Sequence, residues 1–509
     1  MDVPTPPQKR KASISSPSRL TKRTRSISTS FRVNHKTARL EVIRDTEIPV
    51  VSKIPQASLS GLPEELLMSI VQHLERNRNA LAKLCRTNRR FKRLSETVLY
   101  KEISPGCCVG HKGQTERVMR DATLAENVHV AHFVFAFMTT TSAALLAREE
   151  RLQVMKNICN VRKMHIYEGP RSAAKSARLA EELGWLALLN KAVSGHVSTP
   201  SNKFAHLKEL EISMNTVSLA DISSVFHLPS LHTLCLHQVH QTTNIEGWSI
   251  PEGTCNIQTL EIEASFIDIA AVTQIISSMK ALKSFTYSPM TYDWEPFGSE
   301  DNPMSSWVAH SWKELGDALR KHSQSLEVMN VSEHTDPEIL NLVYPNGRAV
   351  GTLGSFKDFP KLRNVTAPIE AFLNVELGQN DLSVYLPFQL VNFSTALTTE
   401  NKAAVACYPS ALESLATVMR PGPEACIFLT IEEELPAVQE LWLPEKIRTL
   451  VNAGIRIHIM NQNGVSEITL DDLTMPASEA SEDEEPEEPE ESPNDEQTGY
   501  VAAGNDSAA

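Results

Sequence analysis

Histidines and cysteines are the first side chains to consider for chemistry in this 509-residue chain. Cys107, Cys108 and His111 would begin a thiolate metal site, but a closed zinc site needs four ligands and no matching pair follows them. A second group contains four histidines within one stretch of sequence: His227, His232, His237 and His240. Their spacing brings them to no common point on a strand, so we expect surface histidines and no metal.

No catalytic motif accompanies these residues. Residues 347–354 lack the glycine spacing and the Lys-Ser/Thr pair of a phosphate-binding loop, and no His-Glu-x-x-His occurs. No cysteine lies in a motif typical of ubiquitin-thioester enzymes. We therefore expect a protein without catalytic residues, metal or cofactor, whose function is binding.

The elements that position the polar side chains form a repeat of the pattern apolar-x-x-apolar-x-apolar. Its copies are Val130/Phe133/Phe135, Val161/Met164/Ile166, Leu207/Leu210/Ile212, Leu231/Leu234/Leu236, Ile257/Leu260/Ile262, Leu282/Phe285/Tyr287, Leu326/Met329/Val331 and Leu362/Val365/Ala367. The copies that start at 207, 231, 257 and 282 lie 24, 26 and 25 residues apart, the period of a leucine-rich repeat. Leu412/Leu415 is a further candidate copy.

Side chains between the apolar anchors should face solvent, because strand side chains alternate between the two faces. This frame exposes His237 and four carboxylates: Glu209, Glu211, Glu261 and Glu263. We interpret them as a dock for a basic peptide, since complementary charge gives selectivity and a fast encounter. The alternative is an ordinary solvated face, because solvent-facing strand positions are usually polar.

The charge distribution supports binding to proteins rather than to nucleic acids. Net charge is −13; residues 1–40 hold ten basic residues against one aspartate, and residues 478–496 hold eleven acids and no base. The remainder is acidic, which disfavours phosphate binding by clustered Lys and Arg. We expect no direct nucleic-acid contact by the folded part.

Both ends of the chain have compositions typical of disorder. We predict a disordered basic tail over 1–55 and a disordered acidic tail over 466–509. Two basic clusters in the first tail resemble a bipartite nuclear localisation signal, with Lys9, Arg10, Lys11, Lys22, Arg23 and Arg25 as its residues. This predicts an import receptor as a partner and nuclear localisation, with a cytoplasmic pool also compatible; a merely solubilising tail is the alternative.

Neither a membrane nor an oxidising compartment is indicated. The longest apolar stretch, Val128–Ala147, is interrupted by histidines and hydroxyl residues, so we expect no membrane span. The eight cysteines are scattered without a CxxC pair, which favours a reducing compartment.

Residues 59–103 predict three short helices. Pro63 suits a first helical turn, and Leu66, Ile70 and Leu74 fall four apart on one helix face. Apolar residues on the next two helices are followed by Leu99-Tyr100. So short a segment buries little surface, which implies a partner.

The order and spacing of Leu62-Pro63, the leucine ladder, Asn88-Arg89-Arg90-Phe91 and Leu99-Tyr100 resemble an F-box. The body is more weakly similar to fungal F-box proteins with degenerate leucine-rich repeats. This resemblance implies an α+β or α/β repeat fold: a three-helix F-box over 56–103, then an irregular leucine-rich-repeat solenoid over 104–465.

The implied function is that of a substrate receptor in an SCF-type cullin-RING ubiquitin ligase. A Skp-type adaptor on a cullin scaffold would bind the F-box, and a protein substrate, in our interpretation a basic one, would bind the repeats. The adaptor-binding residues implied by the resemblance are Leu62, Pro63, Leu66, Ile70, Leu74, Leu81, Leu84, Phe91, Leu99 and Tyr100. The alternative function is a nuclear scaffold that holds histones or other basic proteins.

Overall fold

The structure is a computed structural model that divides into two units, Met1–Leu62 and Pro63–Ala509. It describes residues 59–105, 112–135, 142–168, 184–193, 203–213, 217–241, 245, 247–289, 311–332, 351–374, 377–397, 402–431, 444–461 and 464–468. In the first unit the described residues form a short 3-10 helix, Leu59–Gly61. All other elements belong to the second unit.

A single sheet organises the second unit. Its strands are β1 Glu102–Ile103, β2 Val130–Phe135, β3 Lys163–Glu168, β4 Glu209–Ser213, β5 Thr233–His237, β6 His240–Gln241, β7 Thr259–Ile267, β8 Ser284–Pro289, β9 Val328–Val331, β10 Asn364–Thr366, β11 Asn392–Leu397, β12 Cys426–Ile431, β13 Arg456–Asn461 and β14 Gly464–Ile468. They pair in sequence order, except that the short β6 lies off this path and pairs with β7. The pairs are parallel up to β13, and β14 is antiparallel to β13.

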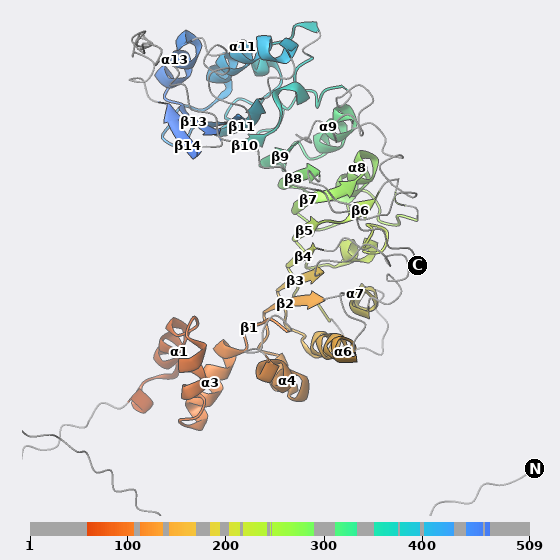
Figure 1. Cartoon of the computed structure of the whole chain (residues 1–509), viewed down its shortest axis with the longest axis vertical. Helices are drawn as coiled ribbons and strands as arrows, with labels where there is room; N and C mark the ends of the chain where they lie inside the picture. The colour runs from red at the N-terminus through yellow and green to blue at the C-terminus, as the bar shows by residue number, and fades with distance from the viewer. Residues whose placement is uncertain are drawn as a thin grey trace, which may run out of the picture. The chain divides into compact units, whose positions relative to one another are not determined.

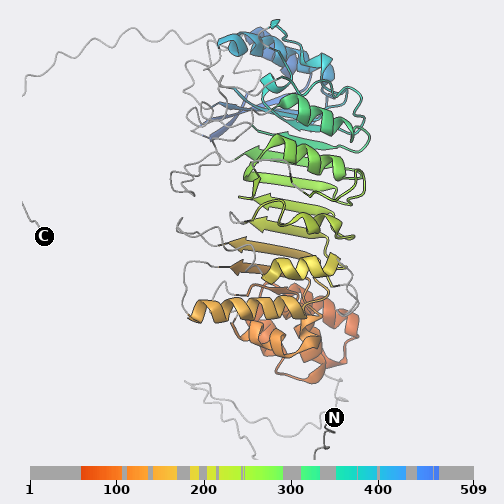
Figure 2. The same cartoon turned by 90° about the vertical axis from the view of Figure 1, so that its right-hand side faces the viewer.

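The helices are α1 Glu64–His73, α2 Arg78–Leu84, α3 Arg89–Leu99, α4 Lys112–Arg120, α5 Ala122–Ala125, α6 Ser142–Asn157, α7 Gly184–Val193, α8 Ile269–Ser278, α9 Trp312–Arg320, α11 Lys402–Val418 and α13 Pro444–Asn452. Figures 1 and 2 agree that α6, α8 and α9 lie on the same side of the sheet. Parallel strands need such crossover segments, and the crossovers cover one face of the sheet.

The apolar repeat anchors form the core between the sheet and these helices. Leu210, Ile212, Leu260 and Ile262 are at most 1% exposed, and the anchors of the other predicted copies from Val161 to Ala367 are buried as well. The predicted strand frame is therefore confirmed for these copies. The outward positions alternate with them along each strand.

Two parts of the predicted frame are wrong. In β2 the buried positions are Ala131, Phe133 and Phe135, so the predicted anchors Phe133 and Phe135 are buried but Val130 is not. Because Ala131 pairs with Met164 and Phe133 with Ile166, the anchors that match the next copy are Val128, Ala131 and Phe133. The predicted copy at Leu412/Leu415 lies in helix α11, and the sheet continues instead through β11, β12 and β13. Apolar spacing of three residues fits one helix face as well as a strand pattern, which explains the second error.

The predicted fold class is wrong. The described residues form an α/β fold dominated by one largely parallel sheet, and they do not establish a three-helix F-box followed by an irregular solenoid. Helix α3 leads through Tyr100 into β1, and Tyr100 and Ile103 pack in the same apolar core as the sheet. The predicted domain boundary between residues 103 and 104 therefore separates residues that share one apolar core. Strand β14 likewise continues to Ile468, past the predicted start of the tail at 466.

Helices α1 to α3 begin where local chemistry favours it. Pro63 precedes α1, whose first turn holds Glu64 and Glu65, where the helix dipole stabilises negative charge. The side chains of Asn77 and Asn88 accept hydrogen bonds from backbone N–H groups in the first turns of α2 and α3. These N-caps stabilise each helix by about 1 kcal/mol.

Candidate functional site

Strand register aligns five polar side chains in one row on the face of β2 to β7 that lies opposite the described helices α6, α8 and α9 (Figures 1 and 2). We call this surface the helix-free face, with reference to the described helices. The row consists of His132, His165, Glu211, Cys235 and Glu261. Parallel pairing without a register shift places their side chains on the same face. The predicted outward positions Glu211 and Glu261 are therefore in this row, and Glu209, His237 and Glu263 lie in the rows beside it.

The central part of this row is a hydrogen-bonded network. His165 Nδ1 lies 2.5 Å from Glu211 Oε2, and the Tyr167 hydroxyl donates to Glu211 Oε1 at 2.9 Å. The same hydroxyl lies 3.0 Å from His165 Nδ1. The ring of His132 stacks on His165 with centroids 4.4 Å apart. His165 is only 7% exposed, so this network is part of the packed face rather than a solvated surface.

These contacts decide the ionisation of Glu211. Burial raises the pKa of its carboxyl, but the Tyr167 hydrogen bond and the neighbouring His165 outweigh burial and lower the pKa below its ordinary value. Burial and His165 together lower the pKa of His132, which favours its neutral form. Glu211 is thus a carboxylate whose oxygens already accept hydrogen bonds from His165 and Tyr167 of the same chain.

Glu209 also forms an ion pair with a basic residue of the same chain. Lys163 Nζ lies 3.0 Å from its Oε2, and this hydrogen bond raises the pKa of Lys163. His237 lies between two carboxylates, with 3.9 Å from Nε2 to Glu211 Oε1 and 3.5 Å from Nδ1 to Glu263 Oε2. Three of the four predicted carboxylates, Glu209, Glu211 and Glu263, therefore have a basic partner on a neighbouring strand.

Glu261 and Glu263, both on β7, are the carboxylates best able to receive an external cation. Glu261 accepts a hydrogen bond from the Cys235 thiol at 3.0 Å and forms no ion pair among the described residues. Burial raises the pKa of Cys235, so this partner stays a neutral thiol. The Glu263 side chain is 44% exposed, and its ion-pair partner among the described residues is His237, whose Nδ1 lies 3.5 Å from Oε2. Of the four carboxylates predicted to form a dock, these two therefore have the weakest basic partners.

An apolar patch on the same face was missed by the sequence analysis. Phe428 on β12 and Met460 on β13 are 42% and 46% exposed, and Phe428 stacks on His458 with ring centroids 5.0 Å apart. Register aligns Phe428 with Ser394 and His458, so these residues share the helix-free face. The sequence gives no signal for this patch, because residues 426–429 are all apolar and only the strand's orientation in the sheet exposes Phe428.

The predicted adaptor-binding residues fall into three classes of exposure. Pro63, Leu66 and Ile70 are exposed; Leu62, Leu74, Leu84 and Leu99 are half-buried; Leu81, Phe91 and Tyr100 are buried. Helix α1 packs instead through Leu67 and Val71, which are both fully buried. Leu66 and Ile70 remain 53% and 40% exposed, so α1 has a second apolar face turned away from its own core.

Other predictions fall partly or wholly beyond the part of the chain that the structure describes. The localisation clusters from Lys9 to Arg25 and the Cys107, Cys108 and His111 group lie outside it. Within it, no group of three or more His, Cys, Asp or Glu residues is arranged to hold a metal ion. Its helices also include none long and apolar enough to cross a membrane.

Comparison with known proteins adds no family. No protein-family model matches the chain, and a search of curated proteins finds no similar sequence.

Proposed function

We propose that this protein is the non-catalytic substrate receptor of an SCF-type cullin-RING ubiquitin ligase. In this proposal, residues 56–103 bind a Skp-type adaptor, and the helix-free face of the sheet binds a basic protein substrate. The receptor contributes to catalysis by holding the substrate near a ubiquitin-loaded enzyme, which raises its effective concentration. We also propose that the basic clusters in residues 9–25 bind an import receptor, which carries the protein into the nucleus.

The observation that supports it most is the second apolar face of α1. Helix α1 packs against the chain's own core through Leu67 and Val71. Leu66 and Ile70 are exposed and therefore do not contribute to that core. Exposed apolar groups that cluster on one face mark interaction sites. Together with the F-box-like order of Leu62-Pro63, Asn88 to Phe91 and Leu99-Tyr100, this favours the adaptor as the partner.

The expected strength of this contact follows from the exposed fractions. Full burial of a Leu or Ile side chain stabilises by about 1.5–3 kcal/mol, and roughly half of each side chain is still available here. Burying the exposed parts of the Leu66 and Ile70 side chains against the adaptor therefore contributes about 2 kcal/mol, or roughly 10- to 100-fold in affinity.

The test is adaptor affinity of the full chain with Leu66→Ala and Ile70→Ala together. We expect a roughly 10- to 100-fold loss with no change in unfolding free energy, because neither side chain is buried. Leu377→Ala is a matched control, since Leu377 is 74% exposed elsewhere in the chain. Unchanged adaptor affinity in the double variant would contradict the proposal.

A second assay separates a ligase receptor from a nuclear scaffold. Wild-type protein reconstituted with adaptor, cullin and RING subunits should direct ubiquitin onto proteins that it co-purifies. Tight binding of basic proteins without adaptor binding or ubiquitin transfer would favour the scaffold function instead.

A further inference from the structure

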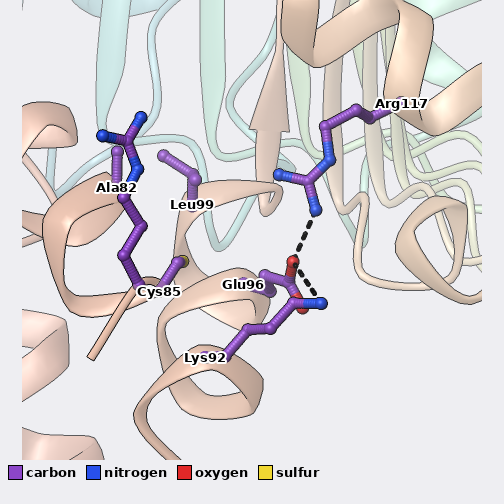
Figure 3. Close-up of a pocket in the computed structure, with 7 residues that line it drawn as sticks. Ala82, Cys85, Lys92, Glu96, Leu99 and Arg117 are labelled. Atoms are coloured by element: carbon purple, nitrogen blue, oxygen red, sulfur yellow. Dashed lines mark hydrogen bonds and ion pairs between the residues drawn. The ribbon is translucent and has the colours of Figure 1, made fainter. Parts of the chain in front are cut away.

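Helices α2, α3 and α4 form a pocket of about 260 Å³ that the sequence analysis did not predict. Figure 3 shows Ala82, Cys85 and Leu99 on one side and Lys92, Glu96 and Arg117 on the other. Arg86 completes the lining.

One wall of the pocket is apolar. Ala82 and Leu99 provide hydrocarbon, and burial raises the pKa of the Cys85 thiol, so that side chain also stays neutral. A neutral cysteine in such surroundings packs as a small hydrophobic side chain. This wall therefore fits an apolar group.

The remaining lining has an excess of positive charge. Arg86, Lys92 and Arg117 face a single acid, Glu96. Glu96 is already paired, at 2.6 Å to Arg117 and 3.9 Å to Lys92, and Arg117 also lies over the Tyr100 ring. Arg86 is exposed and forms no ion pair among the described residues.

The volume favours a small occupant. At about 260 Å³ the pocket lies near the lower end of the range of about 300–1,000 Å³ that is usual for small-molecule sites, and it suits one anchoring side chain of a protein partner. A nucleic acid fits less well, because an apolar wall and an acid are poor contacts for phosphates. The positive rim favours carboxylates beside the anchor.

We infer that this pocket is a second docking point for the adaptor, which inserts one apolar side chain flanked by acidic residues. The inference rests on the proposed function, and it adds a site and a partner chemistry to the exposed face of α1. Charge complementarity selects the acidic segment, because Arg86, Lys92 and Arg117 outnumber the single acid Glu96 in the lining.

The experiment measures affinity of recombinant Skp-type adaptor for the full chain at several salt concentrations. Arg86→Glu should weaken binding roughly tenfold or more, because a like charge then meets the acidic segment. The affinity of this variant should also depend less on salt concentration, because salt screens the attraction between Arg86 and the acidic segment in the wild-type complex. Lys83→Glu is the matched control, because Lys83 is exposed on the same helix and does not line the pocket. It should change affinity less than about threefold.

A second variant and a second probe complete the test. Ala82→Trp should fill the pocket and weaken adaptor binding without charge reversal, which separates occupancy from electrostatics. If wild type binds the adaptor and both pocket variants bind equally well, the pocket inference is wrong while the α1 proposal stands. If wild type does not bind the adaptor, the proposed function itself fails. Loss of binding to a duplex DNA probe in Arg86→Glu, with adaptor binding unchanged, would assign the cations to nucleic acid and overturn the inference.

Discussion

Glu211→Gln tests whether the centre of the helix-free face is structural or ligand-binding. The wild-type carboxylate accepts hydrogen bonds from Tyr167 and, at 2.5 Å, from His165. Its side chain is only 24% exposed, so solvent replaces these bonds poorly. Hydrogen bonds to a charged group contribute about 1.5–3 kcal/mol each, and glutamine keeps one acceptor of reduced strength. We expect the variant to be less stable by about 1–3 kcal/mol at pH 7.

The pH dependence has a defined sign. The pKa of Glu211 is lowered from its model-peptide value of 4.5, so its ionised form contributes stability above that pH. This contribution is lost as pH falls through the folded-state pKa. The stability difference between wild type and Glu211→Gln should therefore be full at neutral pH and shrink below pH 4.5.

The assay is denaturant unfolding of both proteins between pH 7 and pH 3, with Tyr167→Phe and the double variant completing a cycle. Residues in one hydrogen-bond network couple by about 0.5–3 kcal/mol, so the two changes should not be additive. Equal stability of wild type and Glu211→Gln at pH 7, or a difference that grows on acidification, would refute the reasoning.

Three further predictions concern the sheet and the first tail. Leu210→Ala should lower the free energy of unfolding by about 2–5 kcal/mol in the same assay, because Leu210 is 1% exposed. Glu261→Lys with Glu263→Lys should leave folding and adaptor binding intact but abolish ubiquitylation of a basic target; undiminished ubiquitylation would exclude this pair as the dock. Replacing the basic residues in 22–25 with alanine should move a fluorescently tagged protein to the cytoplasm, and unchanged nuclear accumulation would exclude this signal.

Alternation along single strands was predictable without a structure. Leu210 and Ile212 are apolar and Glu211 is charged, and water drives the first two into a core whatever the neighbouring strands are. The same local rule correctly placed His237 on the helix-free face. The N-caps Asn77 and Asn88 are similarly local, because each bonds to N–H groups within three residues.

Only the tertiary structure shows which of two apolar helix faces is buried and which residues distant in sequence are in contact. In α1, both Leu66/Ile70 and Leu67/Val71 are spaced by four residues, so spacing alone could not decide which pair packs against the core and which is exposed. Nor does the sequence reveal that Glu211 is occupied by His165, 46 residues away, whereas Glu261 meets only a thiol. Alternation along a strand sets the face that a side chain occupies, but the pairing of β3 with β4 sets its neighbours, and pairing depends on packing across the whole sheet.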